Sequence, residues 1–189
     1  VKLPSGKGGN GQIVVAESTD DLRAFQQTLA ERMGAIEARS RRPQKGDDII
    51  LSVMNDARHG AIDLRFIAPW ADSDPHSKLN VMIRKVFEIW HETSSNRYTN
   101  PETGRAYDLP GAVQMIFSDL GTQASQTKRG FSAYNWIRSE LIRMGVPAEQ
   151  IAFMQDYDKA AAKLRLFGDL NAGRKRILIG STATMGTGV

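Results

Sequence analysis

The sequence predicts an α/β fold in which a parallel sheet lies between helices in three layers. Strands are predicted near 113–118, 151–154 and 177–180, because the apolar runs 113–117, 151–154 and 177–179 are continuous, as is typical of parallel strands covered on both faces. Segments with helical spacing of apolar residues, at 131–144 and 158–171, lie between these runs. Strands that alternate with helices favour right-handed crossovers and a parallel sheet.

The ends of several elements in this half are marked by particular residues. Gly145 favours a left-handed cap for the helix before it, and Pro147 prevents that helix from continuing. An amphipathic helix is predicted from Lys78 to about Thr93. The polar stretch 94–109 then predicts a loop of about sixteen residues, and loops of that length are usually functional or mobile.

Residues 1–76 are expected to form a mainly helical appendage, and residues 77–189 the sheet-containing lobe. Thr19 and the acidic residues after it predict the start of a helix. Its apolar stripe is formed by Leu22, Phe25, Leu29, Met33 and Ile36. The segment 49–54 is rich in residues that favour β-structure, so a strand or an extended segment is predicted there.

The composition indicates the class of protein but does not identify a binding partner. Of the 189 residues, 41% are hydrophobic and 24% charged, which indicates a folded globular chain. The absence of cysteine excludes disulfides and thiolate metal sites, and no apolar run is long enough to span a bilayer. We therefore expect a cytoplasmic protein. A net charge of +4 permits an anionic partner but does not require one.

Two local patterns suggest phosphate binding without establishing it. The glycine-rich segment 5–11 lacks P-loop spacing, because Gly8 follows Lys7 and no strand precedes it, so we interpret it as a flexible segment. A basic cluster formed by Arg39, Arg41, Arg42 and Lys45 either contacts phosphates or is a solvated helix end. The three histidines have no metal-ligand spacing, and no pair of carboxylates suggests acid–base catalysis.

Three segments carry a resemblance to a known family. The strand 177–180 leads into Ser181-Thr182 and a glycine-rich loop, which resembles motif V of superfamily-two helicases and translocases, especially the chromatin-remodeller-like branch. The segment 111–120, with Phe117-Ser118 at the strand end, resembles motif IV. Ser77-Lys78-Leu79 resembles the beginning of the second RecA-like lobe in remodellers.

Within that branch, segments 117–122, 145–153 and 179–182 are similar to helicase lobes of large phage- and plasmid-borne proteins that join a helicase to a DNA adenine methylase. The resemblance implies a RecA-like lobe of an ATP-dependent DNA helicase or translocase, truncated at motif V, from a bacterial or phage-encoded protein. It implies DNA and the N-terminal helicase lobe of the same polypeptide as partners. ATP and Mg would bind the full-length parent, and we expect this segment to be inactive alone. The alternative is a non-catalytic α/β module that binds nucleic acid or protein.

The resemblance also implies roles for individual residues. Ser118, Thr122, Ser181 and Thr182 would touch the tracked DNA strand, with the alternative that Ser118 and Ser181 only cap strand ends. Lys128 and Arg129 would add phosphate contacts, or form a solvated pair. The residues that would face the nucleotide between the lobes are Gly186, Thr187 and Gly188.

Overall fold

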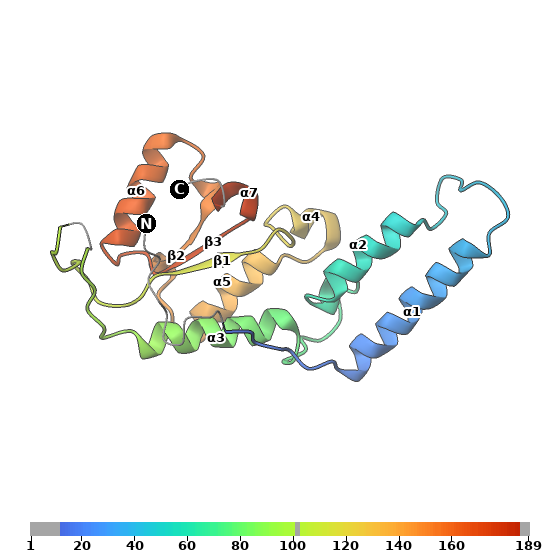
Figure 1. Ribbon diagram of the computed structural model, residues 1–189, viewed down its shortest axis with the longest axis horizontal. Helices are drawn as coiled ribbons and strands as arrows, with labels where there is room; N and C mark the ends of the chain where they lie inside the picture. Colours follow the sequence, from blue (N-terminus) through green and yellow to red (C-terminus); the bar gives the residue numbers. More distant parts are fainter. Residues whose placement is uncertain (1–11, 101–102, 186–189) are drawn as a thin grey trace.

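The computed structural model describes residues 12–100 and 103–185, and it shows an α/β lobe with a helical hairpin extending from one side (Figure 1). The helices are α1 (Asp20–Glu37), α2 (Ile50–Gly60), α3 (Lys78–Glu92), α4 (Ser125–Arg129), α5 (Ala133–Arg143), α6 (Ala160–Asn171) and α7 (Thr182–Met185). The strands are β1 (Gln114–Phe117), β2 (Ile151–Phe153) and β3 (Ile177–Gly180). Short 3-10 turns are η1 (Leu64–Phe66), η2 (Ala148–Gln150) and η3 (Met154–Asp156). Among the described helices, none combines the length and apolar character that a membrane crossing needs.

The sheet has three parallel strands in the order β1-β3-β2, which confirms the predicted parallel α/β arrangement. The chain passes from β1 at one edge of the sheet to β2 at the other edge, and then returns to β3 between them. Because right-handed crossovers that run in opposite directions place their helices on opposite faces, α5 and α6 lie on different sides of the sheet (Figure 1). Helix α3 lies on the α5 side.

The alternation of side chains along β3 divides the core in two. Ile177 and Ile179 pack into a buried cluster with residues of α3 and α5. Leu178 points to the other face, where it packs with Leu166 and Leu170 of α6. The central strand is therefore covered on both faces, as its continuous apolar sequence predicts.

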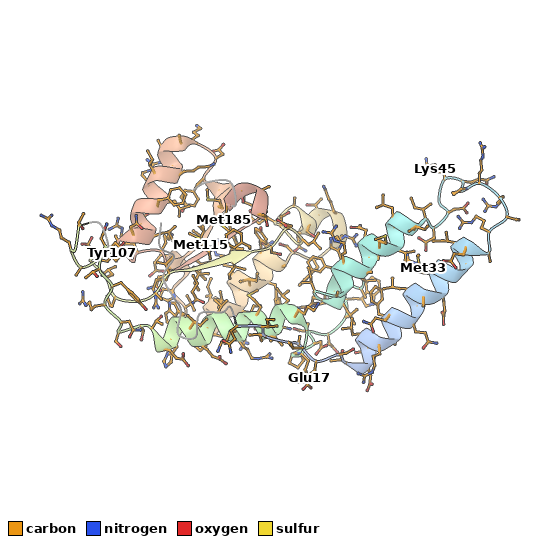
Figure 2. All side chains as sticks on the ribbon, in the orientation of Figure 1. Glu17, Met33, Lys45, Tyr107, Met115 and Met185 are labelled. Carbon is orange, nitrogen blue, oxygen red and sulfur yellow. The ribbon has the colours of Figure 1, made fainter. Side chains whose placement is uncertain are left out.

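Strand β1 differs from this prediction, because only one of its faces is covered by the described residues. Ile116 is buried, whereas Met115 and Phe117 are 50% and 52% exposed. Helix α6 packs over β2 and β3, and β1 lies at the far edge of the sheet from β2. Figure 2 labels Met115 on this strand. The outer edge and one face of β1 thus remain open.

The N-terminal hairpin consists of α1 and α2. Thr19 begins α1 as predicted, since its hydroxyl accepts a hydrogen bond from the Leu22 amide at 3.4 Å. No residue of α1 is fully buried, and its apolar stripe is half-buried against α2. The prediction of a strand at 49–54 is wrong, because α2 begins at Ile50 and buries Val53.

The basic cluster of the sequence lies in the loop that joins these helices, and its members differ. Arg41 forms an ion pair with Asp47, and Arg39 donates to the Asp48 carbonyl at 3.0 Å. Arg42 and Lys45 are exposed, and Figure 2 shows Lys45 at the outer end of the hairpin. Half of the cluster is therefore engaged in shaping the loop.

A buried ion pair lies in the segment that connects the hairpin to the lobe. The Arg65 guanidinium donates two hydrogen bonds of 2.8 Å to the Asp63 carboxylate, and both residues are at most 5% exposed. The guanidinium carbon lies 4.4 Å from the centre of the Phe131 ring and 4.0 Å from that of Trp136. This segment after α2 is consequently part of the core that α5 completes.

Candidate nucleic-acid interface

The loops that follow the three strands meet at the carboxyl edge of the sheet, which faces α4 and the hairpin (Figure 1). Ser118 follows β1 and Ser181 follows β3. These strands are neighbours in register, with Phe117 opposite Gly180, and the Ser118 amide donates to the Gly180 carbonyl at 2.9 Å. The structure therefore brings together two segments that are sixty-odd positions apart in the chain, at the edge where open parallel sheets bind ligands.

Asp119 connects these two loops, and the sequence reasoning did not single it out. Its carboxylate accepts a hydrogen bond of 2.7 Å from the Thr182 amide and one of 3.1 Å from the Thr182 hydroxyl. Asp119 is exposed, so the pair forms part of the surface. The one signal in the sequence is its position directly after the strand end, next to Ser118.

The Ser118 side chain supports the local turn. Its hydroxyl donates to the Leu120 carbonyl at 2.8 Å, and its own carbonyl accepts from the Tyr134 hydroxyl at 2.8 Å. Burial, and secondarily the negative charge of Asp119, raises the pKa of Tyr134 to about 12. The phenol therefore keeps its proton and its hydrogen bond over the physiological pH range. These contacts favour the capping interpretation for Ser118.

Ser181 and Thr182 begin a single helical turn, α7, which lies between the strand and the predicted glycine-rich loop. The Thr184 amide donates to the Ser181 hydroxyl at 3.3 Å, and the Ser181 amide donates to the Thr184 hydroxyl at 3.0 Å. These reciprocal bonds stabilise α7 at its start. Thr182 is exposed, while Met185 at the end of the turn is buried.

Gly121 allows the backbone of the β1–α4 loop to lie close to the core. Its φ of +74° lies in the left-handed region, and a Cβ there would overlap the Phe66 ring and the Ala133 methyl group. Its carbonyl accepts from the Tyr134 amide at 3.1 Å. Thr122 is therefore presented from a loop that is held closely against buried side chains.

A cleft of about 530 Å³ lies beside this edge, between the β1–α4 segment and α2. Its lining residues are Asn55, His59, Asp119, Leu120, Gly121, Thr122, Ala124, Ser125, Lys128 and Arg129. The structure thus places Thr122, Lys128 and Arg129 around one hollow. The His59 ring forms a hydrogen bond of 2.8 Å from Nδ1 to the Asn55 carbonyl, which holds that side chain in the wall.

The two basic residues of α4 differ in their contacts. Arg129 is half-buried and donates to Asp56 of α2 at 3.4 Å and to the Phe66 carbonyl at 3.3 Å. Lys128 is exposed, and within the described residues it forms no ion pair. Arg129 therefore shapes the cleft by attaching α4 to the hairpin, and Lys128 is the cation that remains for a ligand.

The loop after β2 completes the edge. Gln155, directly after the first residue of η3, donates from its amide nitrogen to the side-chain oxygen of Gln123. Together with the Asp119–Thr182 contact, this bond links the loops that follow all three strands. Hydrogen bonds therefore connect the three loops at this edge.

The residues expected to face a nucleotide, Gly186, Thr187 and Gly188, lie outside the described residues. Within 12–100 and 103–185, no group of three or more His, Asp or Glu side chains is placed to hold a metal ion.

Comparisons of the chain with protein-family models, with curated proteins and with solved structures found no match.

Proposed function

We propose that this chain is a second RecA-like lobe of a superfamily-two, chromatin-remodeller-like DNA translocase, of the kind joined to DNA adenine methylases. In this proposal the carboxyl edge of the sheet contacts the phosphates of a DNA strand. An N-terminal helicase lobe would be the other partner. The whole protein would be a cytoplasmic protein encoded by a bacterium or a phage.

The observation that carries the proposal is the gathering of motif-IV-like and motif-V-like residues at one edge. Thr122 and Lys128 line the cleft, and Thr182 is joined to the same loop through Asp119. Hydroxyl, backbone N–H and lysine groups are those that position a phosphate backbone without reading its sequence. The Thr182 amide and hydroxyl both donate to Asp119, so a phosphate oxygen would have to replace that carboxylate as their acceptor. Lys128 is the cation at this edge that is not committed to an internal acid, so it supplies the attraction.

ATP and Mg would be bound by the assembled two-lobe protein, where hydrolysis of ATP supplies the work of translocation. Phosphoryl transfer needs phosphate, metal and arginine contacts together. Among the described residues, no group of three or more His, Asp or Glu side chains is placed to hold the metal ion. We therefore expect no ATP turnover by this chain alone.

The test measures binding of a fluorescent oligothymidine by anisotropy at several salt concentrations. We expect a dissociation constant of about 10⁻⁴ M or weaker, without sequence preference. Lys128→Ala should weaken binding and reduce the slope of log K against log salt by about 0.7, the value for one phosphate contact on a single strand. Arg165→Ala is the matched control, because Arg165 is an exposed cation on α6. Equal losses for both variants would contradict the assignment of the site.

Ser181→Ala with Thr182→Ala tests the other side of the edge. The pair should lose affinity without the change in salt slope that Lys128→Ala causes, since hydroxyls carry no charge. If this variant binds as the unmodified protein does and Lys128→Ala alone abolishes binding, the contact lies on the β1–α4 loop and not after β3.

A second candidate function is a non-catalytic module that binds protein, and the open strand β1 favours it. Val113, Met115 and Phe117 are 39%, 50% and 52% exposed, and their side chains share one face. Edge strands with exposed apolar residues are sites of strand addition. Under this alternative, Met115→Lys with Phe117→Lys would abolish association with a protein partner, and Lys128→Ala would leave oligothymidine binding unchanged.

A further inference from the structure

The most exposed aromatic residue among the described residues is Trp70. Its exposed fraction is 86%, whereas Trp90 and Trp136 are half-buried and donate from their indole nitrogens at 2.8 Å to Gln150 and Asn80. An exposed indole carries a large apolar surface and an N–H group that finds partners when buried. Trp70 is therefore the tryptophan whose position the fold itself does not explain.

The segment that carries Trp70 is fixed and not a free loop. The Ala71 amide donates to the Ala68 carbonyl at 2.9 Å and closes a turn around Trp70. The adjacent Pro69 lies against Gly130, so a Cβ at Gly130 would come within 3.0 Å of the proline ring. Phe66, at the start of this segment, accepts a hydrogen bond from Arg129 through its carbonyl. Trp70 is thus held beside the end of α4.

This attachment places the turn that carries Trp70 beside the end of α4, the helix on which Lys128 lies. Gly130 is two positions after Lys128, and Lys128 lines the cleft at the carboxyl edge. The first charged residues that follow Trp70 in the chain are acidic: Asp72 is exposed, and Asp74 is half-buried and accepts from Thr19 at 3.1 Å and from the His76 amide at 2.7 Å. A strand lying here would keep its phosphates on the Lys128 side and its bases toward the indole.

We propose that Trp70 is a stacking platform for an unpaired nucleobase of the strand whose phosphates contact Lys128. This inference rests on the proposed function and goes beyond it, because it assigns a preference for single-stranded over duplex DNA. A positively charged groove combined with an aromatic surface is the arrangement that binds single strands without sequence preference. Bases within a duplex are already stacked on one another, so they do not present a free face to the indole.

The experiment compares oligothymidine with a blunt duplex of equal length, using tryptophan fluorescence and anisotropy of a labelled strand. Oligothymidine should quench Trp70, and the duplex should not. Trp70→Ala should weaken binding of oligothymidine by about 5-fold to 150-fold, the range that corresponds to one base–aromatic stack. Trp70→Ala should leave the salt slope unchanged, because no charge is removed, whereas Lys128→Ala lowers it by about 0.7.

Two further variants separate stacking from simple apolar contact. Trp70→Phe should keep most of the affinity, and Trp70→Leu, which is apolar but has no π-face, should lose it. If Trp70→Leu binds as tightly as Trp70→Phe, or if the duplex binds as tightly as oligothymidine, the stacking role is wrong. If Trp70→Ala binds normally while Lys128→Ala is impaired, the stacking role is wrong and the proposed phosphate site stands. If neither variant is impaired, both proposals fail.

Discussion

The sheet-containing lobe and the α1–α2 hairpin are stabilised by different forces. In the lobe, Ile137, Leu141 and Ile179 are completely buried in one apolar cluster. In the hairpin, α1 has no buried residue, and Arg32 joins α1 to the second half of the hairpin through Asp48 and Asp56. Partly exposed ion pairs contribute little free energy compared with a packed core.

This difference bears on the candidate site because the cleft lies between the two regions. One wall, formed by the β1–α4 segment, belongs to the lobe, and the other contains Asn55 and His59 of α2. Regions with few buried apolar contacts open locally at lower free energy than the core. We infer that the outer part of the hairpin, and not its buried end at His59, adjusts more readily than the loop around Gly121.

The largest expected effect comes from breaking the buried ion pair in the segment that connects the two regions. Asp63→Ala leaves the Arg65 guanidinium buried without its carboxylate, and such a loss costs about 3–5 kcal/mol of the free energy of unfolding. The measurement is urea denaturation followed by circular dichroism. Replacing both residues, with Asp63→Ala and Arg65→Met, should recover most of the loss, and failure to recover would show that the pair itself is not the cause.

A substitution of equal size in each region tests the comparison directly. Ile137→Ala removes a completely buried side chain and should cost about 2–5 kcal/mol. Leu29→Ala, in the half-buried stripe of α1, should cost about 1 kcal/mol. Equal destabilisation in urea denaturation would mean that the hairpin has a core of the same quality as the lobe.

Removing the central cation of the hairpin should have a local effect. Arg32→Gln loses the ion pairs to Asp48 and Asp56, so amides of α1 and of the first turns of α2 should exchange faster with deuterium. Amides of α5 should keep their protection. Arg23→Gln, which removes an exposed pair with Asp20 within α1, is the matched control and should change neither region.

The smallest expected effect is a dependence of the hairpin on acid pH. The hydrogen bond from Arg32 holds the pKa of Asp48 below its ordinary value, and Arg41 does the same for Asp47. A carboxyl group whose pKa is lower in the folded than in the unfolded state stabilises the folded protein at pH values above its unfolded-state pKa of about 3.9. This stabilisation is lost as the pH falls through the folded-state pKa. NMR signals of α1 should therefore shift only below about pH 4. A transition of the hairpin between about pH 5 and 7 would contradict this assignment.

Much of the lobe could be predicted from sequence because its signals are local. The continuous apolar run at 177–180 forms the central strand, and Gly145 ends α5 with a φ of +110°. Ser77 begins α3 by accepting from the Asn80 amide at 3.2 Å. The meeting of Ser118 with Ser181 also followed from the sequence, since parallel strands bring their carboxyl ends to the same edge.

The features that sequence reasoning missed depend on contacts between distant segments. Segment 49–54 favours β-structure locally, but burial of Val53 in the hairpin makes it helical. Arg129 reaches Asp56 of α2, so its structural role and the cleft itself arise only from packing. Asp119 links two loops because its carboxylate accepts a hydrogen bond from Thr182, and no sequence pattern predicts that contact.

The central claim is that the carboxyl edge of the sheet binds a phosphate backbone. The most direct measurement is an NMR titration of the isotope-labelled chain with oligothymidine, repeated with a methylphosphonate strand whose backbone is neutral. We predict amide shifts concentrated at Thr122, Lys128 and Thr182 for oligothymidine up to about 1 mM, and their loss with the neutral strand. Absence of shifts, shifts located on α6 or the 94–110 loop, or equal shifts with both strands would contradict the claim.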